Sequence, residues 1–416
     1  MAQQFSMTRT PALHFGAGSI KNVPQLLRQL GLKRAFLITG SGSVRGLRQW
    51  RELVETLENE GRYAGDAGVE AEPSPADIDA IASTVRMRVA EVIIGIGGGS
   101  ALDAAKATAV AVMHEGSIRD YLEGVGSRTP TPRRLPLVSC PTTAGTGSEA
   151  TKNAVLSEVG AEGFKKSLRH DAYVPDIAVI DPELALGVPR SVTAASGLDA
   201  ITQNLEAYVS TGAQYFTDAV ALGGLEAAGR SFLRVLEDGT DVDARADMGW
   251  AAHTSGIALA NAGLGLVHGA AGPAGAMHPI PHGLACGRLL PPTTRAAIAK
   301  LRAGASSGAG TGNANRAVGP AATVSRPTRG GPIDTLERYA RAGVALAGED
   351  RGSVNANCDL LVETLERFLE TAALERFSDY GFTAAEIRAL AQKSGLKNQP
   401  VAFDTSEIEA ILREAL

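Results

Sequence analysis

The sequence predicts an α/β fold in which an N-terminal domain with a mostly parallel sheet precedes a C-terminal all-α domain. Over the first half, short apolar runs rich in β-branched residues alternate with segments of helical spacing, a pattern typical of βαβ units. From about Ser191 the β-branched runs stop, and Ala/Leu-rich helical segments follow. We therefore place the two domains at residues 1–190 and 191–416.

The individual elements of the first domain follow from apolar runs that end in glycine or in Asp-Pro. Strands are predicted within residues 33–40, 91–100, 135–149 and 174–182. Helices are predicted over residues 47–61, 76–90 and 101–116. Each strand except the last is thus followed by a helix or a polar loop, which favours βαβ units and a mostly parallel sheet.

The second domain is predicted to consist of helices. They cover residues 192–210, 217–239, 244–260, 359–377, 383–395 and 405–416. Glycines and prolines interrupt residues 267–283, so we expect no long helix to run through them undisturbed. Residues 303–331 are low in complexity and nearly free of large apolar side chains, and we expect them to form a mobile surface loop.

Composition excludes several classes of partner. The formal net charge is −5, so there is no basic field for nucleic acid or for an anionic membrane surface. No apolar run reaches the ~18–20 residues of a membrane helix, and the N-terminus lacks the pattern of a signal peptide. The three cysteines, Cys140, Cys286 and Cys358, form no CxxC motif. We expect reduced thiols and a cytoplasmic protein.

Two polar loops after predicted strands form the first candidate site. Residues 95–107, GIGGGSALDAAKA, place four glycines and a serine between a strand and a helix. Glycines there let backbone N–H groups approach a phosphate at the helix N-terminus, although such turns also serve tight packing. GxGxxG and Walker motifs are absent from this loop. The loop 141–149, PTTAGTGSE, adds small hydroxyl side chains at another strand end, so the pair fits a nucleotide across the sheet edge.

The second candidate site combines a carboxylate with two imidazoles. Asp199 and Gln203 are four residues apart in a predicted helix and so lie on one helical face. His268 and His282 flank the Gly/Pro-rich segment. One carboxylate with two imidazoles is a ligand set for Zn²⁺ or Fe²⁺ that leaves a position open. The alternative interpretation is a solvated aspartate and two loop histidines that only form hydrogen bonds.

Six motifs in this order resemble those of the iron-containing (group III) alcohol dehydrogenase family. They are GGGSALDAAKA, PTTAGTGSE, VIDPELAL, ASGLDAITQNLEAYVS, LANAGLGLVHG and PHG. The resemblance runs from about residue 8 to the C-terminus and fails only across 303–331. It implies an N-terminal dinucleotide-binding, Rossmann-like domain, a C-terminal helical domain and an active site in the cleft between them. It also implies an NAD(P)-dependent oxidoreductase that acts on CH–OH groups, in which dimers are common.

The resemblance assigns the cofactor contacts residue by residue. It implies that the pyrophosphate is held by Gly98, Gly99 and Ser100, and that Asp103 borders the cofactor. It further implies that the adenine and ribose side is lined by Thr142, Thr143 and Thr146, with Lys165 and Leu184 nearby.

The metal ligands that the resemblance implies are incomplete here. Asp199, His268 and His282 match three ligand positions, whereas the fourth, a histidine in the family, is Gln203. A glutamine oxygen is a weaker ligand than imidazole for Fe²⁺ or Zn²⁺. We expect a retained but weaker divalent site, because related glycerol dehydrogenases resemble this layout with one aspartate and two histidines.

A second family histidine is also replaced. The family has this histidine four residues after His268, where this chain has Gly272. We therefore take His278 as the candidate that relays the proton accompanying hydride transfer. The alternative is that His278 lies at the surface or at the edge of the core. If no metal binds, the site resembles that of the metal-independent maleylacetate reductases, and His268 and His282 would polarise the carbonyl as hydrogen-bond donors. Those relatives lose the aspartate, however, and Asp199 is kept.

The loop after the strand at 33–40 favours NADP(H) over NAD(H). NAD-selective proteins of this kind place a carboxylate there to bind the ribose 2′-hydroxyl, and the resemblance puts it at Gly40. Here Gly40 is followed by Ser41, Ser43 and Arg45, with no acid before Glu52. The serines and Arg45 can bind a 2′-phosphate; the alternative is a plain Gly/Ser turn.

Three functions remain open at this point. The first is an NAD(P)-dependent alcohol dehydrogenase or aldehyde reductase, with or without a metal, that acts on a small substrate and works as a homodimer. The second is a lyase resembling 3-dehydroquinate synthase, which we disfavour because the His motif contains no Lys or Arg for a phosphate-bearing substrate. The third is a protein that binds the cofactor without catalysis.

Overall fold

The computed structural model describes residues 4–40, 42–158, 163–307 and 332–416. Its strands are β1 Ala12–Phe15, β2 Ala35–Thr39, β3 Tyr63–Gly68, β4 Val92–Gly97, β5 Leu137–Pro141, β6 Asn153–Glu158, β7 Phe164–Arg169 and β8 Ile177–Ile180. Its first α-helices are α1 Val23–Gln29, α2 Arg48–Asn59, α3 Pro75–Met87 and α4 Gly99–Ala111. The later ones are α5 Arg190–Val209, α6 Tyr215–Glu237, α7 Val242–Ala262, α8 Leu266–Met277, α9 His282–Ser307, α10 Pro332–Ala347, α11 Val354–Ala372, α12 Ala384–Lys393 and α13 Thr405–Arg413.

The chain divides into two compact units. The first, called the sheet unit here, comprises Ser6–Val188 and Thr240–Gly249. The second, the helical unit, is built mainly from Pro189–Gly239 and Trp250–Leu416. The first residues of α7 therefore group with the sheet unit, an assignment that the helical spacing of this segment does not reveal.

The sheet unit is organised around one parallel sheet. Within the described residues it has six strands in the order β1-β8-β5-β4-β2-β3, and every pairing in it is parallel. Both faces are covered, since Phe36 and Ile38 of β2 belong to one buried cluster and Ala35 and Leu37 to another. This alternation is the two-residue period of a strand buried on both sides.

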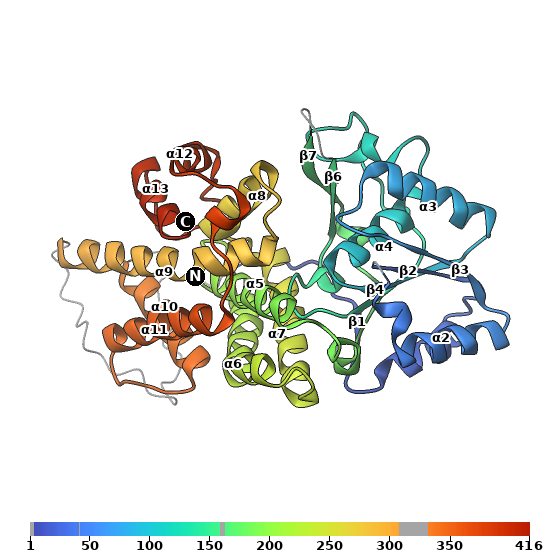
Figure 1. The fold of residues 1–416 in the computed structure, drawn as a ribbon, viewed down its shortest axis with the longest axis horizontal. Helices are drawn as coiled ribbons and strands as arrows, with labels where there is room; N and C mark the ends of the chain where they lie inside the picture. Colours follow the sequence, from blue (N-terminus) through green and yellow to red (C-terminus); the bar gives the residue numbers. More distant parts are fainter. Residues whose placement is uncertain (1–3, 41, 159–162, 308–331) are drawn as a thin grey trace. The chain divides into compact units, whose positions relative to one another are not determined.

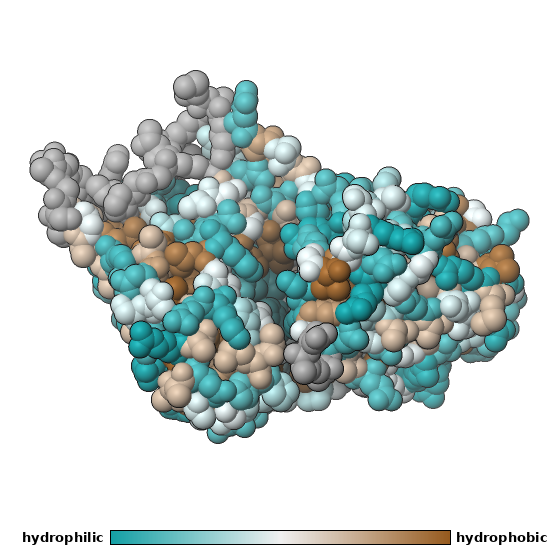
Figure 2. Space-filling view, turned by 90° about the horizontal axis from the view of Figure 1, so that it is seen from above, coloured by the Kyte–Doolittle hydropathy of each residue, from teal (hydrophilic) through white to brown (hydrophobic). Residues whose placement is uncertain are grey.

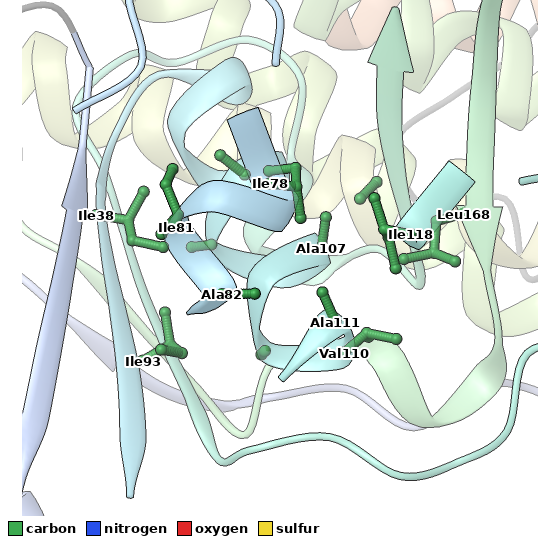
Figure 3. Close-up of a cluster of buried hydrophobic side chains, with 14 of the residues drawn as sticks. Ile38, Ile78, Ile81, Ala82, Ile93, Ala107, Val110, Ala111, Ile118 and Leu168 are labelled. Atoms are coloured by element: carbon green, nitrogen blue, oxygen red, sulfur yellow. The ribbon is translucent and has the colours of Figure 1, made fainter. Parts of the chain in front are cut away.

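The core on the first face is closed by α3 and α4. Ile78, Ile81 and Ala82 of α3 point toward the same apolar layer as Ile38 and Ile93 of the sheet (Figure 3). Burying each large aliphatic side chain of this kind contributes about 1.5–3 kcal/mol to folding. The opposite face is covered by α1 and α2, whose Leu27, Leu53 and Leu57 are buried. The glycine loop between β4 and α4 is thereby fixed at the carboxyl end of an inner strand of the sheet.

The helical unit surrounds α5 (Figure 1). This helix packs against α6 and α9, and most of its residues are buried on all sides, as expected of a central helix. The helix α9 runs on to Ser307, so residues 303–307 are helical rather than loop. The remainder of the loop predicted at 303–331 lies outside the described residues.

The predicted fold class is confirmed: a parallel-sheet N-terminal part precedes a helical C-terminal part. The predicted strands correspond to β2, β4, β5 and β8. The sequence prediction omitted β1, β3 and the antiparallel pair β6–β7. β3 reads YAGDAG and has no apolar run, and β1 and β7 are mostly exposed or half-buried. Pairing with neighbouring strands, rather than their own residues, holds these three strands extended.

The visible face of the molecule carries mostly hydrophilic and neutral residues, with hydrophobic ones in small groups (Figure 2). Among the helices of the described residues, none combines the length and apolar character needed to cross a membrane.

Candidate metal centre and cofactor loops

The helix α5 buries the carboxylate of Asp199. The residue is 2% exposed, and it faces the start of α9, which approaches α5 closely. A Cβ atom at Gly283 would lie 2.4 Å from the carbonyl oxygen of Ala195, a distance that no side chain tolerates. Glycine at this position is therefore what lets the first turn of α9 reach Asp199.

A 12-residue helix, α8, crosses the first part of the Gly/Pro-rich segment and ends at Met277, so no long helix runs through the whole segment, as expected. Pro273 lies inside it and cannot donate to the carbonyl of Gly269. That carbonyl accepts instead from the backbone N–H of Gly395, at 3.2 Å, so the lost helical bond is replaced. The break comes later, at residues 278–281, after which α9 begins at His282. Two helix ends thus carry His268 and His282.

Four side chains converge where these helices meet. Asp199, His268, His282 and Cys286 each offer one ligand atom, and these atoms lie within 4.8 Å of one another. We call them the donor cluster. Nε2 of His268 is 3.4 Å and Nε2 of His282 is 3.9 Å from Oδ1 of Asp199. Sγ of Cys286 is 3.7 Å from both Nε2 atoms. The three predicted ligands are therefore brought together with a thiol that the prediction omitted.

Glu206 fixes the ring of His268. Its Oε2 is 2.7 Å from Nδ1 of His268, and its Oε1 accepts from the backbone N–H of Val267 at 2.7 Å. A carboxylate at Nδ1 places the proton there and leaves the Nε2 lone pair for the donor cluster. This is the arrangement typical of a metal-ligating histidine and its supporting carboxylate.

The electrostatics of the donor cluster favour a cation. Burial raises the pKa of Asp199, but His268 and His282 lower it to about 2. Burial lowers the pKa of His268, but Cys286, Asp199 and Glu206 raise it well above its ordinary value. Burial raises the pKa of the Cys286 thiol to about 12. Among the described residues, Oδ1 of Asp199 is buried and receives no hydrogen bond of good geometry, although Nε2 of His268 lies 3.4 Å away. An unpartnered carboxylate oxygen beside two imidazoles fits the divalent metal that the resemblance implies.

Two predicted residues have other partners. Oε1 of Gln203 accepts a hydrogen bond from the hydroxyl of Ser255 at 2.7 Å, so the oxygen proposed as a ligand is engaged in the core. Nε2 of His278 is 3.1 Å from Oε1 of Glu386, and its ring packs against Phe382 at a tilt of 46° with centroids 4.2 Å apart. These contacts agree with the core-edge alternative for His278.

Sequence reasoning missed Cys286 and Glu206. Both had a positional signal, because Cys286 follows His282 by four residues and Glu206 follows Asp199 by seven, so each shares a helical face with a predicted ligand. The signal was too common to single them out. Only the packing of α5, α8 and α9 brings Cys286 and Glu206 next to the predicted ligands.

In the sheet unit, the two polar loops lie side by side at the carboxyl ends of β4 and β5. These strands pair in parallel, with Gly97 opposite Pro141. A Cβ atom at Gly98 would lie 3.4 Å from Oγ1 of Thr143, and one at Gly99 would lie 2.8 Å from Cγ2 of Thr146. The glycine loop thus rests against two of the three predicted threonines. The third, Thr142, is buried, and its N–H donates to the carbonyl of Gly97 at 3.0 Å.

Asp103 of α4 stabilises the loop after β5 through hydrogen bonds. It accepts from the hydroxyl of Ser148 at 2.5 Å and from the N–H of Val155 at 2.9 Å, and burial raises its pKa. The nearby Lys106 is fully buried and donates to Ser148 and to the carbonyl of Asn153. Ser100 lies in the first turn of α4. The helix and the polar loop are therefore tied together by polar contacts.

The loop after β2 lies beside a carboxylate of β3 that the sequence prediction did not include. Arg45 forms an ion pair with Asp66 of β3, which also accepts from the hydroxyl of Tyr63. Asp66 lies close to Arg45 because β3 pairs with β2, the strand that precedes this loop. Gly40 directly follows β2, and a Cβ atom added there would meet none of the described atoms within 4 Å. Ser43 is exposed, and Ser41 lies outside the described residues.

The remaining two cofactor predictions have contacts of their own. Lys165 forms an ion pair with Glu72. Leu184 is 3% exposed and belongs to the buried cluster beneath α1 and α2. In the described residues, these contacts account for both side chains without a cofactor.

The chain is similar to proteins of one family along nearly its whole length. Residues 10–182 match iron-containing alcohol dehydrogenase, and residues 193–416 match the C-terminal part of the Fe-containing alcohol dehydrogenase family. It is 37% identical over 284 residues to long-chain-alcohol dehydrogenase 1 of Geobacillus thermodenitrificans, covering 68% of this chain and 70% of that one. It is 33% identical over 390 residues to the probable alcohol dehydrogenase EutG of Escherichia coli, covering 92% and 86%. The crystal structure of a 1,3-propanediol oxidoreductase is similar in fold, with a TM-score of 0.83, 26% identity and full coverage of both chains.

Proposed function

We propose that this chain, which belongs to the iron-containing alcohol dehydrogenase family, interconverts a small alcohol and its aldehyde with a nicotinamide cofactor and a divalent metal. The observation that carries the metal proposal is the donor cluster around the unpartnered Oδ1 of Asp199. A buried carboxylate oxygen without a hydrogen bond is costly, and a bound cation would remove that cost.

The residues have separate roles in this proposal. Asp199, His268 and His282 would hold a divalent cation, Fe²⁺ or Zn²⁺, which supplies Lewis acidity toward the substrate oxygen. Glu206 keeps Nε2 of His268 directed at the donor cluster. The side chain of His282 is 32% exposed, whereas those of Asp199 and His268 are almost fully buried. Substrate would therefore reach the donor cluster on the side of His282.

The cofactor would supply or accept the hydride. The residues proposed to hold it are Gly40, Ser41, Ser43, Gly98, Gly99, Ser100, Asp103, Thr142, Thr143, Thr146, Lys165 and Leu184. The mutual contact of the glycine loop with Thr143 and Thr146 supports this proposal, because backbone N–H groups at the start of α4 and neighbouring hydroxyls suit a pyrophosphate.

The function is tested by measuring the reduction of a panel of short aldehydes by protein stripped of metal and then reloaded with Fe²⁺ or Zn²⁺. We expect about one ion per chain and turnover that depends on it. Turnover that persists without metal and resists chelators would refute the metal role and favour the metal-independent reductase. Cofactor binding without turnover of any alcohol or aldehyde would refute the enzyme activity itself.

We also propose that NADP(H) is preferred over NAD(H). Gly40 carries no carboxylate to repel a 2′-phosphate, and Arg45 lies at this loop. Asp66 is the opposing influence, since it neutralises Arg45 in the absence of cofactor. For the preference to hold, Arg45 must turn from Asp66 to the phosphate or contact both. The side chain of Arg45 is 45% exposed, so it has the freedom to do so.

Replacement of Gly40 by aspartate is expected to shift the ratio of kcat/KM values toward NADH, because the new carboxylate accepts from the ribose 2′-hydroxyl and repels a 2′-phosphate. The position has room for the side chain. Arg45→Ala should weaken NADPH selectively, by about 1.5–3 kcal/mol for a lost charge-assisted bond. The measurement is kcat/KM for both cofactors with one aldehyde. A clear preference of the unmodified protein for NADH, or a ratio unmoved by Gly40→Asp, would contradict the proposal.

A homodimer and a cytoplasmic location complete the proposal. The strand β1 lies at the edge of the sheet, and its Leu13 and Phe15 are 37% and 42% exposed. An edge strand with exposed apolar side chains supports pairing with a second copy. All three cysteines are free and buried, which agrees with a reducing compartment.

A further inference from the structure

We infer that Cys286 is a fourth metal ligand, and that its thiolate makes the donor cluster selective for Zn²⁺ over Fe²⁺. This inference rests on the proposed metal site but concerns a residue that the family resemblance does not assign. The resemblance implies a histidine at position 203, where this chain has Gln203. Cys286 supplies a replacement donor from a different helix.

The position of the thiol matches that of a ligand. Cys286 lies one helical turn after His282 on α9, fully buried, with Sγ 3.7 Å from Nε2 of both histidines. Ligands about 2.0–2.1 Å (N or O) and 2.3 Å (S) from a tetrahedral ion are separated by roughly 3.4 Å (N to O) and 3.6 Å (N to S). The observed separation of 3.4 Å between Nε2 of His268 and Oδ1 of Asp199 fits as well, whereas Nε2 of His282, at 3.9 Å from the same oxygen, must move closer on binding.

An independent observation points to an ion at the same place. Oδ1 of Asp199 is buried and has no hydrogen-bond partner in the described part of the chain, although it lies beside the two imidazoles that also face Sγ. The alternative fourth donor, Oε1 of Gln203, already accepts from the hydroxyl of Ser255. The thiol is therefore the better-placed donor of the two.

The donor chemistry determines which metal is favoured. A thiolate is a soft ligand that suits zinc, whereas an amide oxygen is a hard one. A ligand set of one carboxylate, two imidazoles and one thiolate therefore shifts the relative affinity toward Zn²⁺. Binding must displace the thiol proton, which goes to solvent or buffer as the sulfur–metal bond forms.

The test uses Co²⁺ as a spectroscopic substitute for Zn²⁺ in the full-length protein. We expect the Co²⁺-loaded protein to show a thiolate-to-cobalt charge-transfer band in the near ultraviolet, at one ion per chain. Cys286→Ser should abolish the band and lower Zn²⁺ affinity by roughly 100-fold or more, since even the outer partners of ligands contribute about 10–100-fold. It should also lower the ratio of Zn²⁺ to Fe²⁺ affinity.

Cys358→Ser is the matched control, because Cys358 is also buried in a helix of the same unit and its thiol donates to the carbonyl of Leu336, away from the donor cluster. It should keep the band. Stoichiometric Co²⁺ binding without the band in the unmodified protein would overturn the inference and leave the three-ligand site intact. Absence of Co²⁺ and Zn²⁺ binding altogether would overturn the proposed metal site with it.

Discussion

Asp199→Ala is expected to eliminate stoichiometric metal binding and to lower kcat/KM for aldehyde reduction by about 10³-fold, or about 4 kcal/mol. The carboxylate is the charged member of the predicted ligand set, and its Oδ1 lies within 4 Å of both histidine Nε2 atoms. Without it, the two imidazoles and the Cys286 thiol keep no carboxylate in the donor cluster. The measurements are metal content after reloading and steady-state rates with one aldehyde.

Gln203→Ala provides the comparison, since it removes the other predicted ligand on the same face of α5. We expect a far smaller loss of metal affinity, because Oε1 of Gln203 is bonded to Ser255 and carries no charge. Gln203→His should raise metal affinity by restoring an imidazole donor. Equal losses from Asp199→Ala and Gln203→Ala would mean that the metal is held elsewhere. Circular dichroism of both variants checks that the fold is retained.

The fold could be predicted where residues reveal their burial without help from partners. The strands β2, β4 and β8 consist almost entirely of buried apolar residues, so composition alone identifies them. The edge strands β1 and β3 could not be found in this way. Half-exposed positions and the glycines of β3 remove the pattern, and the decisive interactions come from β8 and β2, far along the chain.

The candidate metal site could be predicted only as far as its motifs reach. Asp199, His268 and His282 each lie in a motif of the family resemblance, and the structure brings them together. Cys286 and Glu206 could not be predicted in this way, because they come close to these ligands only through the packing of the helices. Gly283 allows α9 to approach α5, and this approach turns an ordinary helical cysteine into a neighbour of two histidines.

The cofactor loops illustrate the same limit. The residues that follow β2 contain no acid before Glu52, yet Asp66 reaches Arg45 from β3. A neighbouring strand cannot be identified before the sheet order is known, and β3 itself was not predicted. The contact between the glycine loop and residues 141–149, in contrast, follows from β4 and β5 being parallel neighbours.

Gly99→Ala is expected to lower kcat/KM for both nicotinamide cofactors by about 10²-fold, and to raise the Kd of the cofactor. Its Cβ would lie 2.8 Å from Cγ2 and 3.0 Å from Oγ1 of Thr146. Because contacts this short do not persist, the Thr146 side chain, the loop that carries it or the start of α4 must move. A displacement near 1 Å in a site that positions reacting groups costs about 10²-fold. Fluorescence titration with NADPH and with NADH measures the Kd of each cofactor.

A second substitution separates this steric effect from a loss of stability. Thr146→Ala removes Cγ2 and Oγ1 and leaves only Cβ, which would be 3.4 Å from the new methyl group, an ordinary contact. The double variant should therefore bind cofactor more tightly than Gly99→Ala alone, even though Thr146 is itself a proposed cofactor contact. Gly187→Ala controls for loss of glycine in the same unit, since its added methyl group would have no described atom within 4 Å. Unchanged cofactor binding by Gly99→Ala would show that this loop does not hold the pyrophosphate.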